Sequence, residues 1–589
     1  MTRAKALSLV ATLLGLLGLA DALYLTWLKW SHEVMGFADS SVCRALSKSG
    51  CQIALESRMG TVGPVSVSII AAACYVVVVV LARISAYRAG FAVPALRLVS
   101  AGAVLWSLVL GITSLVARQF CPYCVALYVI NLALLGVAWS LPTDVAGVGP
   151  TVRAVFGARR SLAWSVAGFL AATAGGHALY QWRATVAIGA LADQDEKRLA
   201  EALALGRFAP PLTDAASVGP EDARFTIVEY LDFQCPHCRR LRESLSEVRR
   251  QRPTEIRIVT RHEPLSSECN PMMPATGHDR ACAAAVAAEC ARRQGRFEEY
   301  ADQLFTHQDA LGETELIDYA REVGLDLAAL ETCRGSDDAK AAIRRDALQG
   351  IAVAALGTPT WYVNGMRLQG GAPVVSVHRM LRGVEALLER GVPEAPAMAR
   401  QRAMLARPRV PSGAAGRAIT SRLDAVDRPL PEVVAYVDPA TAAGRRIIGW
   451  VAMMGELPSL RVGIRTMAPT CAADATTPAC QVAASLACAV VEGVLSDVRP
   501  RLPAEGEGDD PAALAQRLSS EVPRVGACVS AGRGAALLAE DRAAAAAAGV
   551  TRSPMVVLAG YTLDAPETLD ELQMHLAAAL LAHGKPAGQ

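Results

Sequence analysis

The chain has 589 residues, of which 52% are hydrophobic and 19% are charged. This composition excludes intrinsic disorder, and the length predicts several domains. With 58 basic and 56 acidic residues, the formal net charge of +2 gives no electrostatic basis for binding nucleic acid. Fifteen cysteines are many for a reducing compartment and favour an oxidising one.

Five apolar stretches in the first third are long enough to cross a bilayer, which requires about 20 residues. They cover residues 6–28, 64–82, 96–117, 123–141 and 161–181. A cleaved signal peptide is the alternative for the first stretch, although its apolar run continues from Tyr24 to Leu28 beyond the candidate cleavage site. Basic residues favour the loops on the N-terminal side, so we expect a cytoplasmic N-terminus and the soluble part on the opposite side.

Two Cys-x-x-Cys pairs fall on that opposite side. Cys121 and Cys124 stand where the fourth helix begins, and Cys235 and Cys238 follow a strand-like run at 225–231. A helix N-terminus stabilises a thiolate, and a second thiol one turn later can form a disulfide with it. A zinc site is the alternative, but its two pairs usually lie within about 20 residues of each other, and these are much farther apart. We therefore expect redox chemistry and no metal.

Cys43 and Cys51 form a third pair in the loop after the first stretch. Three dithiols on one side of a membrane can pass two electrons by thiol–disulfide exchange if each pair reaches the next. Residues 1–142 resemble the vitamin K epoxide reductase family in its bacterial form. The residues that carry the resemblance are Cys43, Cys51, Ser57, Gly63-Pro64 and Phe120-Cys121-Pro122-Tyr123-Cys124.

This resemblance implies a membrane domain in which Cys124 faces a bound quinone (ubiquinone or menaquinone) and Ser57 lies near it. It also implies that Cys121 exchanges with Cys51, while Cys43 meets the soluble partner. A turn residue is the alternative for Ser57. Cys74, midway along the second helix, is interpreted as a packing thiol.

Residues 218–390 resemble the DsbA-type thioredoxin domain. The resemblance is carried by Cys235-Pro236-His237-Cys238 and by the later Gly357-Thr358-Pro359-Thr360. It implies that Pro359 is cis and packs beside the active-site disulfide. It also implies that Glu229 is a buried acid beneath Cys238 that can accept a proton, with an exposed strand glutamate as the alternative. His237 is expected to favour the Cys235 thiolate.

Residues 431–589 repeat the sequence pattern of the DsbA-type domain but lack its Cys-x-x-Cys motif. The run 433–438 aligns without gaps on 227–232, and Thr441 to Gly444 then fall on the Cys-Pro-His-Cys motif. Ser553-Pro554 corresponds to Thr358-Pro359. We expect a second, degenerate thioredoxin-like domain that has lost both catalytic thiols and the buried acid. Chance similarity between alanine-rich helices is the alternative.

Four further cysteines occur in the same order in each soluble segment. Cys282 and Cys290 are eight residues apart on a predicted helix, a rise of about 12 Å, so they cannot pair with each other. The expected structural disulfides are Cys269–Cys282, Cys290–Cys333, Cys471–Cys480 and Cys488–Cys528. The crossed connectivity within each domain stays open.

The expected architecture is multidomain: an all-α transmembrane helix bundle, with a four-helix core and a fifth helix, followed by two α/β thioredoxin-like domains. Residues 143–217 would hold a cytoplasmic loop, the fifth helix and a linker. Residues 391–430 would be a flexible linker between the soluble domains.

The expected function is quinone-coupled thiol–disulfide oxidation in the bacterial inner membrane. Electrons would pass from reduced secreted or periplasmic clients through Cys235–Cys238, Cys43–Cys51 and Cys121–Cys124 to the quinone. Two alternatives stay open. One is an isomerase or reductase that works with a reduced Cys-Pro-His-Cys motif, because Thr358 also occurs in isomerase relatives. The other is a membrane-anchored chaperone or assembly factor.

Overall fold

The computed structural model describes most of the chain, in two compact units. The described residues are 3–35, 60–87, 89–116, 121–145, 147–410, 417–418, 431–455, 457, 460–468, 471, 476–503 and 510–583. The first unit is built from the helices up to Glu196, with the short segment Pro373–Arg379. The second unit holds the remaining residues, which form two α/β domains.

Five helices among the described residues are long and apolar enough to cross a membrane, which confirms the five predicted spans. They are α1 (Arg3–Met35), α4 (Val67–Ser85), α5 (Ala89–Val116), α6 (Pro122–Ser140) and α8 (Arg159–Leu205). The short helix α7 (Val148–Gly157) and the hairpin β1–β2 (Thr61–Val62, Val65–Ser66) complete this unit. Helix α8 is 47 residues long and continues well past residue 181, because the stretch after it is rich in Ala and Leu, which favour helix.

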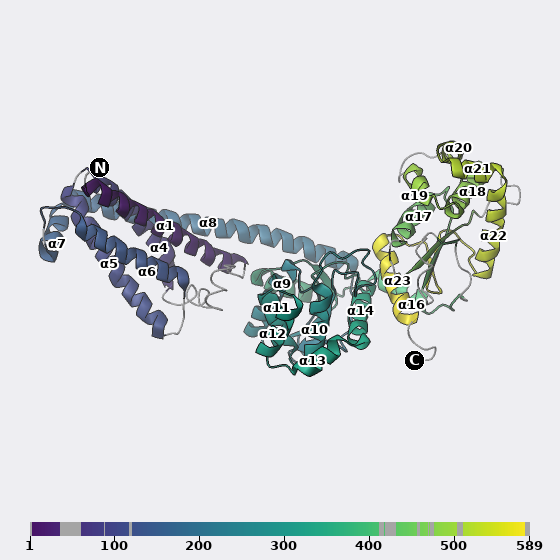
Figure 1. Ribbon diagram of the computed structural model, residues 1–589, viewed down its shortest axis with the longest axis horizontal. Helices are drawn as coiled ribbons and strands as arrows, with labels where there is room; N and C mark the ends of the chain where they lie inside the picture. The colour runs from purple at the N-terminus through teal and green to yellow at the C-terminus, as the bar shows by residue number, and fades with distance from the viewer. Residues whose placement is uncertain are drawn as a thin grey trace. The chain divides into compact units, whose positions relative to one another are not determined.

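The helices α1, α4, α5 and α6 pack side by side as a bundle (Figure 1). Its interior holds apolar side chains such as Leu96 and Leu134, whereas Leu17 and Leu105 point outward and are exposed, as expected for lipid-facing positions. Helix α1 approaches α4 closely at Gly18. A Cβ atom there would lie 2.3 Å from the Cε1 atom of Tyr75, so only glycine admits this ring.

Arg97 satisfies the C-terminal end of α6. Its Nε donates to the carbonyl oxygen of Ala138 at 3.1 Å, and its Nη2 donates to that of Leu141 at 3.0 Å. The last carbonyl groups of a helix have no partner within the helix and carry partial negative charge. The buried guanidinium therefore ties α5 to α6 through its hydrogen-bonded N–H groups.

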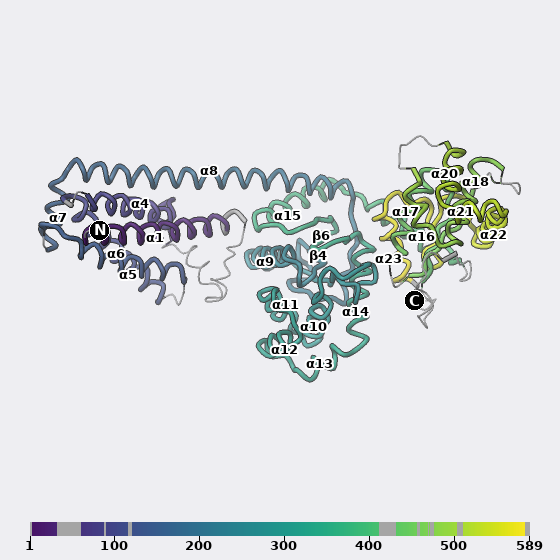
Figure 2. The backbone as a smooth tube through the Cα atoms, turned by 45° about the horizontal axis from the view of Figure 1, so that its top comes forward, coloured from purple at the N-terminus to yellow at the C-terminus, as the bar shows by residue number. Residues whose placement is uncertain are grey.

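The first α/β domain has a five-stranded sheet of order β3-β5-β4-β6-β7. Its strands are β3 (Ala216–Val218), β4 (Phe225–Leu231), β5 (Ile256–His262), β6 (Thr360–Val363) and β7 (Met366–Gln369). Its helices are α9 (Pro236–Gln251), α10 (Ala281–Arg293), α11 (Phe297–Thr306), α12 (Glu313–Glu322), α13 (Leu327–Arg334), α14 (Asp337–Ala352) and α15 (Val374–Glu389). Helices α10 to α13 gather on one side of β4 and β6 (Figure 2). Strands β4 and β5 are parallel, and β6 is antiparallel to β4. This is the thioredoxin-like mixed sheet that the sequence predicts.

The second α/β domain repeats this order as β8-β10-β9-β11-β12. Its strands are β8 (Arg417–Ala418), β9 (Glu432–Val437), β10 (Arg461–Thr466), β11 (Met555–Leu558) and β12 (Tyr561–Asp564). Its helices are α17 (Ala442–Met454), α18 (Pro478–Val491), α19 (Leu495–Val498), α20 (Pro511–Glu521), α21 (Pro523–Ser530), α22 (Arg533–Ala547) and α23 (Leu569–His583). The expected second thioredoxin-like fold is confirmed.

The register of the two sheets agrees residue by residue. Glu229 pairs with Trp361, and Ala435 pairs with Val556. Each partner stands two residues after a cis proline, since the Thr358–Pro359 and Ser553–Pro554 peptides are both cis. The gapless alignment made from sequence therefore places equivalent residues at equivalent positions of the fold.

The segment expected to be a flexible linker contains helix α16 (Pro396–Leu405). Within it the amide of Gln401 is buried and donates to the carbonyl oxygens of Ala352 at 2.9 Å and Met574 at 3.3 Å. Buried Met398 and Met404 lie on the same helix. Part of residues 391–430 is thus packed structure, because its apolar side chains have a surface to cover; residues 411–416 and 419–430 lie outside the described residues.

We predict that Gly18→Val lowers the melting temperature of the detergent-solubilised protein by several degrees, because the added side chain collides with the Tyr75 ring. Gly136→Val on α6 is the matched control, since nothing lies within 4 Å of a Cβ atom there. Fluorescence-detected size-exclusion chromatography after heating measures both variants. Equal melting temperatures for the two would show that α1 and α4 do not pack in this way.

Candidate functional site

Cys235 and Cys238 frame the first turn of α9. Cys235 is the N-cap residue, and Pro236 takes the first helical position, where a missing N–H group has no consequence. The amide of Cys238 donates to the carbonyl oxygen of Cys235 at 3.0 Å. Cys235 is 5% exposed and Cys238 is 1% exposed, so an incoming thiol reaches the sulfur of Cys235 first.

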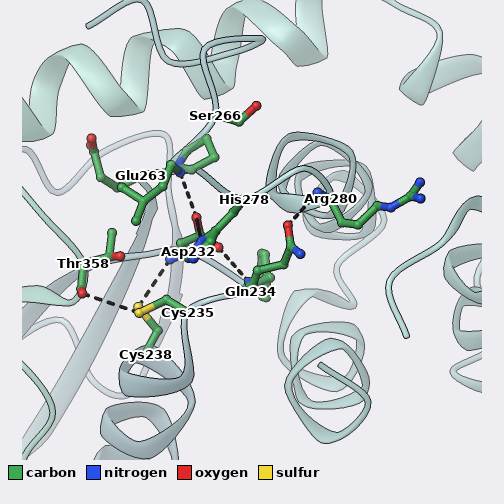
Figure 3. A network of polar contacts seen from close by, with 12 residues as sticks. Asp232, Gln234, Cys235, Cys238, Glu263, Ser266, His278, Arg280 and Thr358 are labelled. Carbon is green, nitrogen blue, oxygen red and sulfur yellow. Dashed lines mark hydrogen bonds and ion pairs between the residues drawn. The ribbon is translucent and has the colours of Figure 1, made fainter. Parts of the chain in front are cut away.

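The cis peptide before Pro359 lies beside this pair. The thiol of Cys235 donates to the carbonyl oxygen of Thr358 at 3.5 Å (Figure 3). That carbonyl is held in place because Thr360 begins β6, which is paired with β4. Cys235 therefore lies beside the cis Thr358–Pro359 peptide.

The two thiols of this pair have opposite acidities. Hydrogen bonds from the Cys238 thiol, together with smaller contributions from Thr358 and the amides of Cys238 and His237, lower the pKa of Cys235 to about 5. Burial and the bond to Cys235 raise the pKa of Cys238 well above its usual value. Cys235 is thus the thiolate near neutral pH. His237 was expected to favour the Cys235 thiolate, and its contribution comes from its backbone amide.

Glu229 lies on β4 inside a buried polar cluster. Its Oε1 accepts hydrogen bonds from Arg242 Nη1 at 3.1 Å and from Thr260 Oγ1 at 2.8 Å. Arg242 also forms an ion pair with Glu298. Burial raises the pKa of Glu229, although Arg242 opposes the shift. The carboxyl group is therefore suited to taking up and releasing a proton below α9.

A second buried carboxylate, Asp232, connects the cysteine loop to the segment that precedes α10 (Figure 3). Its Oδ1 accepts from the amide of Gln234 at 2.6 Å, and its Oδ2 accepts from the amide of Leu265 at 2.7 Å. His278 Nδ1 lies 2.9 Å from the same Oδ2. The amide of Asp232 donates to the Cys238 sulfur at 3.4 Å. Asp232 thus fixes the residues on both sides of the cysteine pair.

Three residues of the buried polar network were not predicted from the sequence: Arg242, Asp232 and His278. Arg242 had a detectable signal: it stands one residue after Leu241 and three before Leu245, on the apolar face of α9. An arginine on a buried helix face needs an acidic partner. The Asp232–His278 contact joins residues 46 positions apart, and no sequence pattern indicates such a pairing.

Cys121 and Cys124 repeat the same local design inside the helix bundle. Cys121 is the N-cap residue of α6 and Pro122 follows it. The Cys121 sulfur accepts a hydrogen bond from the amide of Cys124 at 3.3 Å. Leu25 and Leu28 of α1 pack against Cys121, so the pair lies against apolar side chains. Cys43, Cys51 and Ser57 lie outside the described residues.

A cavity of about 520 Å³ lies among α4, α5 and α6. Its walls are mainly apolar and include Cys74, which the sequence analysis assigned to packing. Three polar groups meet in it: Tyr75 donates to Asn131 Oδ1 at 2.8 Å, and Asn131 Nδ2 donates to Ser107 Oγ at 2.9 Å. All three residues are buried. The sequence analysis did not identify them, because isolated polar residues in apolar helices carry no spacing signal.

In the second α/β domain Thr441 occupies the position of Cys235. Its hydroxyl accepts from the amide of Gly444 at 3.0 Å, so it caps α17 as the Cys121 sulfur caps α6. Gly444 stands in the place of Cys238, and a Cβ atom there would lie 2.0 Å from the carbonyl oxygen of Asp438. The backbone has therefore closed over the space that the second sulfur would need.

Four disulfides stabilise the soluble domains: Cys269–Cys282, Cys290–Cys333, Cys471–Cys480 and Cys488–Cys528. They have the connectivity that the sequence analysis favours, not the crossed one. Among the described residues no group of three or more His, Cys, Asp or Glu side chains is arranged to hold a metal ion.

Comparison with known families agrees with this geometry. A model of the vitamin K epoxide reductase family matches residues 9–139, and a model of the DSBA-like thioredoxin domain matches residues 226–382. The chain joins a vitamin K epoxide reductase family domain to a DsbA-like thioredoxin domain.

Curated relatives share only part of the chain. The Na(+)/H(+) antiporter NhaA of Herminiimonas arsenicoxydans is 36% identical over 163 residues, which are 28% of this chain and 24% of that protein. NhaA 1 of Mycolicibacterium gilvum (strain PYR-GCK) is 37% identical over 165 residues, or 28% of this chain and 25% of that protein. Because the match spans about a quarter of these antiporters, we infer no ion transport from it.

Solved structures resemble one part of the chain. A thioredoxin-like oxidoreductase from Silicibacter pomeroyi DSS-3 is 25% identical, with a TM-score of 0.25, and the match covers 30% of this chain and 94% of that one. BdbD from Bacillus subtilis is 18% identical, with a TM-score of 0.27, and the match covers 31% of this chain and 98% of that one.

The lowered pKa of Cys235 predicts how alkylation of the reduced protein depends on pH. The thiolate is the reactive form, so the alkylation rate should be half-maximal near pH 5 and level by about pH 7, whereas an ordinary cysteine is half-maximal near 8.5. Mass spectrometry of the Cys235 peptide after timed alkylation measures the rate. Cys238→Ala removes the strongest hydrogen bond and should move the midpoint upward. A midpoint above 8 in the unsubstituted protein would contradict the prediction.

The second domain supplies a control for the Glu229–Arg242 pair, because its equivalent residues are the buried Ala435 and Ile448. Arg242→Ile alone should destabilise the fold by about 3–5 kcal/mol, since it leaves Glu229 buried without its cation. The double variant Glu229→Ala/Arg242→Ile should recover most of that loss and yet oxidise dithiols more slowly. Melting temperature and turnover measure the two effects. A double variant less stable than Arg242→Ile would contradict the interpretation.

Proposed function

We propose that the protein makes disulfides in secreted or periplasmic proteins and transfers the electrons to a membrane quinone. Electrons pass from reduced clients to Cys235–Cys238, then to Cys43–Cys51, then to Cys121–Cys124. The observation that carries the proposal is the repeated design of the two described pairs, each with its first cysteine at a helix N-cap. One pair lies in a soluble thioredoxin-like domain and the other lies against apolar side chains of a membrane bundle.

The acidities in the soluble pair support the oxidising direction. A client thiolate attacks the Cys235 sulfur of the disulfide, and Cys238 leaves and takes up a proton, for which its raised pKa suits it. A second client thiolate then attacks the mixed disulfide, and Cys235 leaves as a thiolate of low pKa. The client gains a disulfide and the enzyme holds two more electrons. Because stabilisation of the Cys235 thiolate favours the reduced form, the disulfide is a good oxidant.

The cavity beside α6 fits a quinone. It is apolar over most of its wall, and the Ser107 hydroxyl and the second amide N–H of Asn131 can donate to ring carbonyl oxygens, while Tyr75 holds Asn131 in place. Tyr128, one helical turn after Cys124, also lines it. A bound quinone, ubiquinone or menaquinone, supplies a two-electron acceptor. In our proposal these side chains orient the ring and keep water away from the Cys121–Cys124 pair.

The location follows from the same chemistry. Four disulfides in the soluble domains favour an oxidising compartment. We therefore assign the bundle to the bacterial inner membrane, with the N-terminus in the cytoplasm and both thioredoxin-like domains on the periplasmic side. Reduced clients and the quinone pool are then both accessible to one chain. A chain that carries both pairs needs no separate partner to reoxidise the first pair.

The proposal is tested with purified full-length protein, a reduced unfolded dithiol protein and a soluble quinone. We expect quinol and client disulfide to form in equal amounts. Cys235→Ala and Cys124→Ala should each reduce both products to background, whereas Ser140→Ala, an exposed position on α6, should not. Continued turnover by Cys124→Ala would overturn the electron path. A mostly reduced Cys235–Cys238 pair trapped in cells would favour an isomerase or reductase instead.

A further inference from the structure

Asp21 is the only acidic residue within the apolar spans of α1, α4, α5 and α6, all of which the structure describes. Lys29, the next charged residue on α1, stands eight residues later, or about 12 Å along the helix. Asp21 therefore lies within the apolar part of the helix. An ionisable side chain there is energetically unfavourable in a membrane, and such residues usually serve a function inside a bundle.

The position of Asp21 on α1 directs it into the bundle. Three residues earlier Gly18 contacts the ring of Tyr75, and four residues later Leu25 packs against Cys121. Positions spaced by three and four residues share one face of a helix. Asp21 therefore lies between Tyr75 and the Cys121–Cys124 pair, and it is within electrostatic range of all three side chains.

One oxygen of the partly buried Asp21 carboxyl group has no structural role that the described residues show. Its Oδ2 is buried and has no hydrogen-bond partner among them. A buried carboxylate oxygen without a partner is unfavourable, so such an atom binds a proton or a transient partner. Tyr75, the polar residue beside Asp21, instead donates its hydroxyl to Asn131.

We propose that Asp21 holds a proton for the Cys121–Cys124 pair while that pair is reduced. In this proposal the Cys121 thiol transfers its proton to the Asp21 carboxylate and becomes a thiolate. The S–S bond then forms as two electrons pass to the quinone, the proton of Asp21 follows to a quinone oxygen, and the Cys124 thiol supplies the second proton. Two electrons and two protons leave the dithiol, and all four are found in the quinol. The proposal rests on the proposed function for its acceptor.

Three variants separate proton transfer from a structural role. Asp21→Asn keeps the shape of the side chain and removes the proton site, whereas Asp21→Glu changes the shape and keeps it. Thr12→Val is the control, a buried polar position on the same helix that bonds only to the Ser8 carbonyl. We expect quinone reduction to fall at least about 100-fold in Asp21→Asn. The rate of quinone reduction by Asp21→Glu should stay within about tenfold of that of the unsubstituted protein. The rate of Thr12→Val should equal that of the unsubstituted protein.

Infrared difference spectroscopy tests the proton directly and needs no quinone. The reduced-minus-oxidised spectrum of the full-length protein should contain a carboxylic acid C=O band that is absent in Asp21→Asn, shifted in Asp21→Glu and unchanged in Thr12→Val. Absence of the band from the unsubstituted protein, or its persistence in Asp21→Asn, would overturn the proposal. If Asp21→Asn does not fold, the shift in Asp21→Glu decides. A normal band without any quinone reduction would instead show that the proposed function is wrong.

Discussion

The chemistry of this protein depends on placing a cysteine at the N-cap of a helix. At an N-cap the backbone amides of the first turn have no partner in the helix and point at the capping atom. Cys235 and Cys121 both use this position, each followed by a proline that needs no N–H group there. The arrangement stabilises a thiolate without a bound cation, and it therefore works in a polar domain and in a membrane bundle alike.

The second thioredoxin-like domain shows which parts of the fold serve chemistry and which serve stability. It keeps the sheet order, the cis proline and two disulfides. It replaces the ion pair of Glu229 and Arg242 with the apolar Ala435 and Ile448, both fully buried. The ion pair and the thiols are thus absent together from a domain that keeps the fold, and a buried ion pair stabilises no better than well-packed apolar side chains.

Local patterns made most of the fold predictable. Apolar runs gave the five membrane helices, and the gapless match of 433–438 to 227–232 gave the second domain and its strand register. The site was predictable where its residues form a motif, as for Cys235, Cys238 and Pro359. It was not predictable for Asp232 with His278, or for Tyr75 with Asn131, because these pairs lie 46 and 56 residues apart and form only when the helices and strands have packed.

The thiols of the two cysteine pairs lose and take up protons in environments of opposite polarity. Beside the Cys235–Cys238 pair lies Asp232, whose amide donates to the Cys238 sulfur and whose carboxylate contacts His278. The same domain also buries the Glu229–Arg242 ion pair. Around Cys121 the described neighbours are mainly apolar, and a thiolate formed there is stabilised by its own helix. A dithiol in an apolar bundle must still lose two protons when it is oxidised. Within the apolar spans of α1, α4, α5 and α6, Asp21 is the acidic side chain that can bind one of these protons.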